Sequence, residues 1–138
     1  MDSIKIKDYM DRRPVLLKAN MSLAVAVEHL LTSSRPGAPV IGETGQLVGF
    51  LSQQDCLSVM LKSSYHCDLT STVSDCMRTD VLSVGPEDSM LHLAEQMTGA
   101  KPKIYPVVAD GKVIGVITRQ DVLKAMNTYM QQCYLKPA

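Results

Sequence analysis

The chain has 138 residues, of which 46% are hydrophobic and 20% are charged, and its formal net charge is zero. This composition is typical of one globular domain with a genuine core, and it argues against nucleic-acid or anionic-membrane binding that relies on bulk electrostatics. No stretch approaches the roughly 18 apolar residues of a membrane span and no apolar run resembles a signal peptide, so we expect a cytoplasmic protein.

The first half of the chain carries the signals of a β-α-β-β-α unit. In chain order these are a short apolar segment at 15–17, a helix from residue 23, two strand-like runs at 38–41 and 47–51, and a second helix from residue 52. Apolar residues from Leu23 to Leu31 recur at helical spacing and mark a buried stripe. The two strand-like runs flank a turn that contains Gly45, which favours a hairpin.

The stretch 63–72 is polar and is expected to be a linker. It contains His66, Cys67 and Asp68, which are potential metal ligands. A structural metal site normally needs a second pair of ligands at a suitable spacing, and the sequence offers none. We therefore expect a surface linker and no metal site, with the scattered cysteines reduced.

The second half repeats the same order of signals. They are an apolar segment at 81–84, a helix after the capping residue Ser89, strand-like runs at 105–108 and 113–117, and a helix from residue 118. Asp110-Gly111 is a strong signal for a two-residue hairpin turn. An apolar face continues beyond Asn127, so the last helix is expected to be longer than its counterpart.

The two halves align when Asp8 is placed on Asp75. The stretch Ile41–Leu57 (IGETGQLVGFLSQQDCL) then matches Val108–Leu123 (VADGKVIGVITRQDVL). A repeated unit that cannot bury its apolar face alone gains a core by packing against its copy. We therefore expect an α+β fold of two β-α-β-β-α repeats packed as a pseudo-twofold pair, with repeat 1 at 1–62, a linker at 63–72 and repeat 2 at 73–138.

The most specific motif present in both halves is glycine, two hydrophobic residues, a hydroxyl and, three residues later, an aspartate. It occurs at Gly49–Asp55 and again at Gly115–Asp121. One interpretation is a helix cap, because a hydroxyl followed three residues later by an acid is the pattern of a capping box. A second interpretation is a ligand site, and the two are geometrically compatible.

Three observations favour a ligand site in addition to the cap. A glycine inside a strand marks close approach by a ligand or by another backbone segment, and a cap does not need it. A helix N-terminus with a free hydroxyl attracts phosphate. A carboxylate one turn into the helix is placed to accept hydrogen bonds from ribose hydroxyls.

Taken together, these motifs resemble a tandem pair of CBS (cystathionine-β-synthase) domains, a Bateman module. The resemblance covers Ile6 to Asn127 and rests on the D-x-M start of each repeat, the V-x-P-E-x-S helix start of the second repeat, the P-V strand, and the G-h-h-S/T-x-x-D motif. It implies binding of an adenosine-containing ligand, such as AMP, ADP, ATP or S-adenosylmethionine, in clefts between the repeats.

By position, the resemblance assigns ribose to Asp55 and Asp121, phosphate to Ser52 and Thr118, and the base to the backbone around two strand starts. With the candidate phosphate partners of the second repeat, the expected nucleotide-binding residues are Gly37, Ala38, Ser52, Asp55, Lys103, Ile104, Tyr105, Thr118, Arg119 and Asp121. Tyr105 stacks on the base or packs in the core, and the sequence favours neither.

The two sites are expected to differ in affinity. The second repeat has Arg119 beside its hydroxyl and Lys101 and Lys103 before its strand, whereas the first has Gln53 and, as its one nearby cation, Arg35. These cations can bind phosphate, although each taken alone is more typical of a solvated surface. We expect the tighter site at Asp121.

Three functions are consistent with such a chain. The first is a stand-alone regulatory module that binds an adenosine nucleotide and signals to a separate effector protein. The second is a structural or dimerisation module without nucleotide, since methionines on the expected helices provide an adaptable association surface and homodimers are common in the family. An enzyme is the weakest, because no catalytic triad, metal spacing or Gly-rich phosphate loop is present and His29 and His92 have no partner acid.

Overall fold

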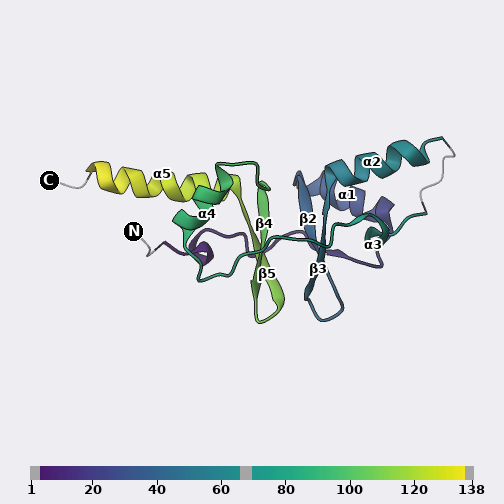
Figure 1. Cartoon of the computed structure of the whole chain (residues 1–138), viewed down its shortest axis with the longest axis horizontal. Helices are drawn as coiled ribbons and strands as arrows, with labels where there is room; N and C mark the ends of the chain where they lie inside the picture. The colour runs from purple at the N-terminus through teal and green to yellow at the C-terminus, as the bar shows by residue number, and fades with distance from the viewer. Residues whose placement is uncertain (1–3, 66–69, 136–138) are drawn as a thin grey trace. The chain divides into compact units, whose positions relative to one another are not determined.

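A computed structural model describes residues 4–65 and 70–135 of the chain. It contains two compact units, each built around one β-hairpin (Figure 1). The first-hairpin unit comprises the described residues of 13–82 together with 110–113. The second-hairpin unit comprises 4–12, 83–109 and 114–135. The mixed α+β fold and the two repeats predicted from the sequence are confirmed.

The first-hairpin unit has a three-stranded sheet in the order β1-β2-β3. Its elements are β1 (Leu17–Lys18), α1 (Leu23–Ser33), β2 (Gly37–Ile41), β3 (Leu47–Ser52), α2 (Gln53–Ser63) and α3 (Val73–Cys76). Strand β1 is parallel to β2, and β2 is antiparallel to β3. The Ser22 hydroxyl accepts a hydrogen bond from the Val25 N–H and caps α1, as expected for a Ser at this position.

The second-hairpin unit has the same plan with a shorter sheet. Its elements are a 3₁₀ turn η1 (Ile6–Asp8), α4 (Met90–Met97), β4 (Ile104–Ala109), β5 (Lys112–Thr118) and α5 (Arg119–Leu135). The strand expected at 81–84 is reduced to a single parallel bridge between Val84 and Val107. Helix α5 is longer than α2, as the sequence predicted.

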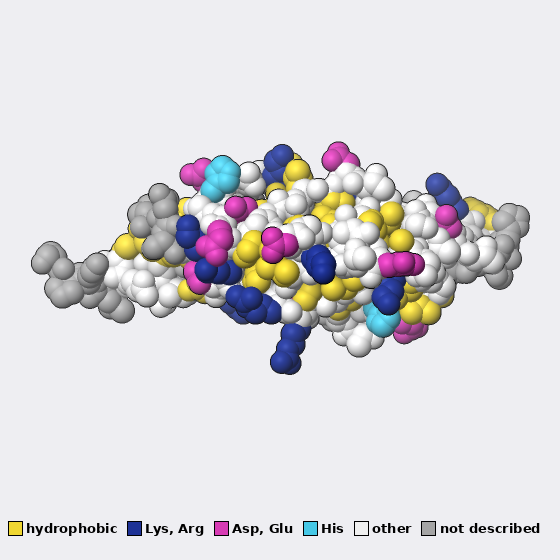
Figure 2. Space-filling model, turned by 90° about the horizontal axis from the view of Figure 1, so that it is seen from below, with side chains coloured by type: hydrophobic (Ala, Val, Ile, Leu, Met, Phe, Trp, Pro, Cys, Tyr) yellow, Lys and Arg dark blue, Asp and Glu magenta, His cyan; other side chains and the backbone are white. Residues whose placement is uncertain are grey.

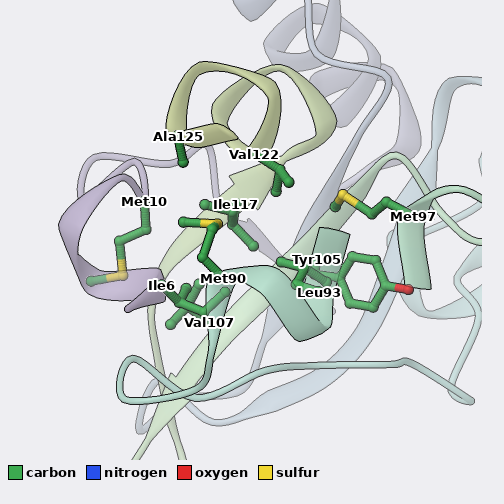
Figure 3. Packing of buried hydrophobic residues seen from close by; sticks show 10 residues of the cluster. All are labelled: Ile6, Met10, Met90, Leu93, Met97, Tyr105, Val107, Ile117, Val122 and Ala125. Atoms are coloured by element: carbon green, nitrogen blue, oxygen red, sulfur yellow. The ribbon is translucent and has the colours of Figure 1, made fainter. Parts of the chain in front are cut away.

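Each unit buries its own hydrophobic cluster between its helices and its hairpin. The cluster of the second-hairpin unit is drawn in Figure 3 and consists of Ile6, Met10, Met90, Leu93, Met97, Tyr105, Val107, Ile117, Val122 and Ala125. The first-hairpin cluster consists of Leu17, Leu23, Ala26, Leu30, Ala38, Val40, Leu51, Cys56 and Val73. The equivalent residues Ile6 and Val73 are both fully buried.

The leading segments of the repeats, residues 4–11 and 71–78, are exchanged between the units. The Ile6 N–H donates to the Asp88 carbonyl at 3.0 Å, which attaches the first leading segment to the second-hairpin unit. Conversely, the Val73 N–H donates to the Met21 carbonyl at 2.9 Å. Each compact unit therefore combines the leading segment of one repeat with the remaining elements of the other repeat.

The residues that the structure describes contain no helix long and apolar enough to cross a membrane. On the face drawn in Figure 2, basic and acidic side chains are interspersed, in keeping with the formal net charge of zero. Part of the expected linker, residues 66–69, lies outside the described residues, and so does the candidate ligand group His66, Cys67 and Asp68.

Candidate functional site

The motif at Ser52 forms a capping box at the N-terminus of α2. The Ser52 N–H donates to Asp55 Oδ2 at 3.1 Å, and the Asp55 N–H donates to Ser52 Oγ at 3.0 Å. Two backbone donors at the helix start are thereby satisfied by side chains. The aspartate side chain is held at the end of β3, with 15% of its surface exposed.

The second copy of the motif has the same geometry at the start of α5. The Thr118 N–H donates to Asp121 Oδ2 at 2.9 Å, and the Asp121 N–H donates to Thr118 Oγ1 at 3.1 Å. Both Ser52 and Thr118 are half-buried. In each box the backbone N–H of the hydroxyl residue binds Oδ2, and Oδ1 of the aspartate takes no part in the cap. The cap interpretation is thus correct for both motifs.

The strand starts expected to contact the base lie directly beside these helix starts. Gly37 pairs with Ser52 in the ladder between β2 and β3. The Gln53 N–H donates to the Pro36 carbonyl at 2.8 Å, and in the other unit the Arg119 N–H donates to the Lys103 carbonyl at 2.8 Å. The structure therefore brings each hydroxyl–aspartate pair next to the backbone that the resemblance to CBS domains implied for the same site.

The motif glycines are required by the protein backbone. A Cβ added at Gly49 would lie 2.8 Å from the Arg78 carbonyl oxygen and 2.5 Å from Met77 Sδ. A Cβ at Gly115 would overlap the carbonyl oxygen of Asp11. A glycine inside a strand can mark close approach by a ligand or by another backbone segment. Here the second explanation applies, because the two leading segments approach Gly49 and Gly115.

Arg78 is a site residue that sequence reasoning did not identify. Its Nη2 lies 3.2 Å from Asp55 Oδ1, and its Nε lies 3.3 Å from Oδ1 and 3.4 Å from Oδ2. Burial raises the pKa of Asp55, but hydrogen bonds from Ser52 and Arg78 outweigh it and hold the pKa below its ordinary value. The available signal was that Arg78 aligns with Asp11, a reversal of charge directly after the D-x-M motif.

Tyr105 packs in the core, which is one of the two alternatives left open by the sequence. It is 2% exposed, and Figure 3 shows its ring among the side chains of the cluster with the hydroxyl directed away from them. The hydroxyl has no hydrogen-bond partner in the described part of the chain, and burial raises its pKa. The equivalent residue in the first-hairpin unit is Ala38, which is also buried.

The cations of the second-hairpin unit are exposed around the start of α5. Lys101, Lys103 and Arg119 lie on the surface, and none forms an ion pair within residues 4–65 and 70–135. In the first-hairpin unit the side chain of Gln53, which stands in place of Arg119, donates to the Arg35 carbonyl at 2.7 Å. The second-hairpin unit therefore has a cation, Arg119, at the position where the first-hairpin unit has the uncharged Gln53.

An apolar groove of about 430 Å³ runs between α1 and α2 of the first-hairpin unit. It is lined by Val27, Leu30, Leu31, Gln53, Gln54, Cys56, Leu57 and Met60. Leu31 and Leu57 are 63% and 68% exposed, which is unusual for leucine in a well-packed helix pair. The groove has the character of an association surface.

The groups at the two helix starts are of the kind that form hydrogen bonds with a polar ligand. A helix N-terminus, a hydroxyl and a carboxylate at each site offer donors for phosphate and acceptors for hydroxyl groups. Asp55 and Asp121 belong to different compact units. Within the described residues, no three His, Cys, Asp or Glu side chains are grouped so as to hold a metal ion.

Comparisons with known proteins agree with this arrangement. The sequence model of the CBS domain matches residues 6–62 and 73–128. A Vibrio cholerae protein that carries the name of an acetoin utilization protein, AcuB, is 27% identical with a TM-score of 0.84, and the match covers 98% of both chains. CBSX2 from Arabidopsis thaliana, whose structure was determined in complex with AMP, is 29% identical with a TM-score of 0.80, over 93% of this chain and 99% of that one.

Some relatives carry the matching region inside a longer protein. The A-adding tRNA nucleotidyltransferase of Aquifex aeolicus is 29% identical over 94% of this chain, which corresponds to 15% of the enzyme. The chain spans less than half the length of the curated relatives that it matches first. In this enzyme, therefore, most of the length lies outside the region that resembles this chain.

Proposed function

The chain belongs to the CBS domain family, and we propose that it is a regulatory module that binds an adenosine-containing ligand and signals to a partner protein. The observation that carries the proposal is the hydroxyl–aspartate pair that caps both α2 and α5, each beside a strand start. AMP in CBSX2, at 29% identity, supports an adenosine compound as the ligand.

The chemistry of the sites suits the parts of a nucleotide. An ionised carboxylate accepts hydrogen bonds from the two ribose hydroxyls, and such charge-assisted bonds are about twice as strong as neutral ones. The helix N-terminus and the hydroxyl of Thr118 favour phosphate, and Lys103 and Arg119 add positive charge beside it. We propose the site at Asp121 as the tighter of the two, for AMP, ADP, ATP or S-adenosylmethionine.

The proposed role needs binding and no chemical step. A ligand that prefers one conformation of the chain shifts the population towards it, and a partner protein that reads this conformation responds. We propose that the effector is a separate protein. No residue of this chain is proposed to take part in catalysis. A cytoplasmic location remains a prediction of the sequence.

The test is a binding titration of the purified chain with AMP, ADP, ATP, S-adenosylmethionine and GTP. Asp121→Ala should raise the Kd for the adenosine compound at least tenfold, since a hydrogen bond to a charged group contributes about 1.5–3 kcal/mol. Ser89→Ala is the matched control, because it removes the cap of α4 in the same unit and leaves Asp121 in place. Equal loss of affinity in both variants, or no binding by the unmodified chain, would overturn the proposal.

A second candidate function is a structural or dimerisation module, and the exposed groove between α1 and α2 favours it. We propose that a second copy of the chain covers this groove. Leu57→Lys should then convert a dimer into a monomer in light scattering, whereas Ser58→Lys places the same charge one residue further along α2 and should not. A dimer that needs Leu57, in a chain that binds no nucleotide, would favour the structural function.

A further inference from the structure

The carboxylate proposed to bind ribose in the first-hairpin unit is covered by a guanidinium group of the same unit. Three donor–acceptor distances of 3.2 to 3.4 Å join Arg78 to Asp55, and they involve both carboxylate oxygens. Oδ2 also accepts the hydrogen bond of the Ser52 N–H. Both oxygens that a ribose diol would use are therefore already engaged.

The position of Arg78 is fixed by the backbone. Its N–H donates to the Phe50 carbonyl at 2.9 Å, and the Phe50 N–H donates to the Arg78 carbonyl at 2.8 Å. Phe50 lies one residue after Gly49, whose missing side chain makes room for this segment. The arginine is thereby held opposite Phe50, which lies two residues before Ser52, the start of the capping box.

The second-hairpin unit has Asp11 at the corresponding place. The Asp11 N–H donates to the Val116 carbonyl at 2.8 Å, and the Val116 N–H donates to the Asp11 carbonyl at 3.0 Å. Val116 follows Gly115 as Phe50 follows Gly49. The two positions are equivalent in backbone pairing and opposite in charge.

This difference changes what each aspartate offers to a ligand. A guanidinium donates hydrogen bonds to a carboxylate, whereas an ionised carboxylate has no donor and repels a second one. Asp11 therefore cannot form with Asp121 the ion pair that Arg78 forms with Asp55. The Arg78 side chain is 64% exposed, so the guanidinium is free to leave Asp55 at a modest cost.

We propose that Arg78 is the residue that sets the different affinities of the two sites, by covering Asp55 and competing with the ribose of a ligand. The inference rests on the proposed function. A nucleoside binds readily at Asp121, where Asp11 replaces the arginine, and must displace Arg78 to bind at Asp55. The first-hairpin site is consequently filled only at higher ligand concentration.

The test measures AMP and adenosine binding in an Asp121→Ala background, in which the remaining binding reports the site at Asp55. Adding Arg78→Ala should tighten binding roughly fivefold, the factor that corresponds to about 1 kcal/mol for an exposed ion pair. Arg12→Ala in the same background is the control, because Arg12 is an exposed arginine that directly follows the other leading segment. Asp11→Arg in the otherwise unmodified chain should weaken binding at Asp121.

The outcomes separate this inference from the proposed function. Weaker AMP binding on Arg78→Ala would show that Arg78 contacts the phosphate and would overturn the inference, as would unchanged binding. An NMR titration of the Asp55 carboxyl without ligand provides an independent readout, in which Arg78→Ala should raise its pKa. An unchanged pKa overturns the ion pair itself. A raised pKa with no AMP binding by any variant overturns the proposed function and with it the role of Arg78, and leaves the ion pair intact.

Discussion

Replacing Gly115 by alanine should destabilise the second-hairpin unit by blocking the docking of the first leading segment. The added Cβ would overlap the backbone carbonyl oxygen of Asp11 and lie 3.5 Å from Met10 Sδ. A flexible side chain could move away from the new methyl group, but a backbone carbonyl held in a pair of hydrogen bonds cannot do so cheaply. Either the strain persists or the leading segment shifts.

Both routes lead to a similar cost. Overpacking a tightly packed position costs about 1–3 kcal/mol. If the segment shifts, the two hydrogen bonds between Asp11 and Val116 are lost, at about 1 kcal/mol each. We therefore expect Gly115→Ala to lower the free energy of unfolding by about 2 kcal/mol. For a chain of this length this is a fall in Tm on the order of 8 °C.

Urea denaturation followed by far-UV circular dichroism measures the effect, since the chain has no tryptophan for fluorescence. Gly99→Ala is the matched control: its Cβ would meet only the Gln96 carbonyl oxygen, at 3.9 Å, and fewer unfolded conformations should leave stability equal or slightly higher. A change below about 0.5 kcal/mol for Gly115→Ala would refute the docking argument. Destabilisation of both variants alike would refute it too.

Three further changes test other parts of the structure. Tyr105→Phe should raise the free energy of unfolding by about 1 kcal/mol in the same assay, because it removes a buried hydroxyl without a partner in the described residues. A fall of similar size in the free energy of unfolding would show that the hydroxyl forms a hydrogen bond and would contradict this expectation. The pKa of Asp55 is lower in the folded chain than its ordinary value of 3.8, so its contribution is present above that pH and is lost as the pH falls through the folded pKa. The difference in stability between the unmodified chain and Asp55→Asn should therefore shrink between about pH 5 and about pH 3, and a constant difference contradicts the direction of the shift. Leu51→Ala should cost about 3 kcal/mol and Leu123→Ala less than about 0.5 kcal/mol, since these leucines are 0% and 68% exposed; equal losses would contradict the assignment of the core.

Much of the fold was predictable because its signals are local. The capping boxes at Ser52 and Thr118 need only four consecutive residues, and the structure forms both of them. The turn at Asp110-Gly111 places both residues at positive φ, as an Asp-Gly hairpin turn requires. Repetition of these signals identified two similar units before any contact between distant residues was known.

The weaker predictions concerned pairing between distant segments. The strand expected at 81–84 forms only the bridge from Val84 to Val107, because a short apolar run does not reveal how many of its backbone groups find partners. Tyr105 had two plausible surroundings, and the structure places it in the hydrophobic cluster of the second-hairpin unit. The strand glycines had two explanations as well, of which contact with a leading segment is the correct one.

The sequence by itself determined the two repeats, the helix–hairpin–helix order within each and the position of each hydroxyl–aspartate pair. These follow from propensities, caps and turns that act over a few residues. Only the tertiary structure decided that residues 4–11 pack with the second hairpin and residues 71–78 with the first. That exchange places Arg78 on Asp55, 23 residues away in sequence. Spacing along the chain carries no information on such a contact, because it depends on which buried surface each leading segment completes.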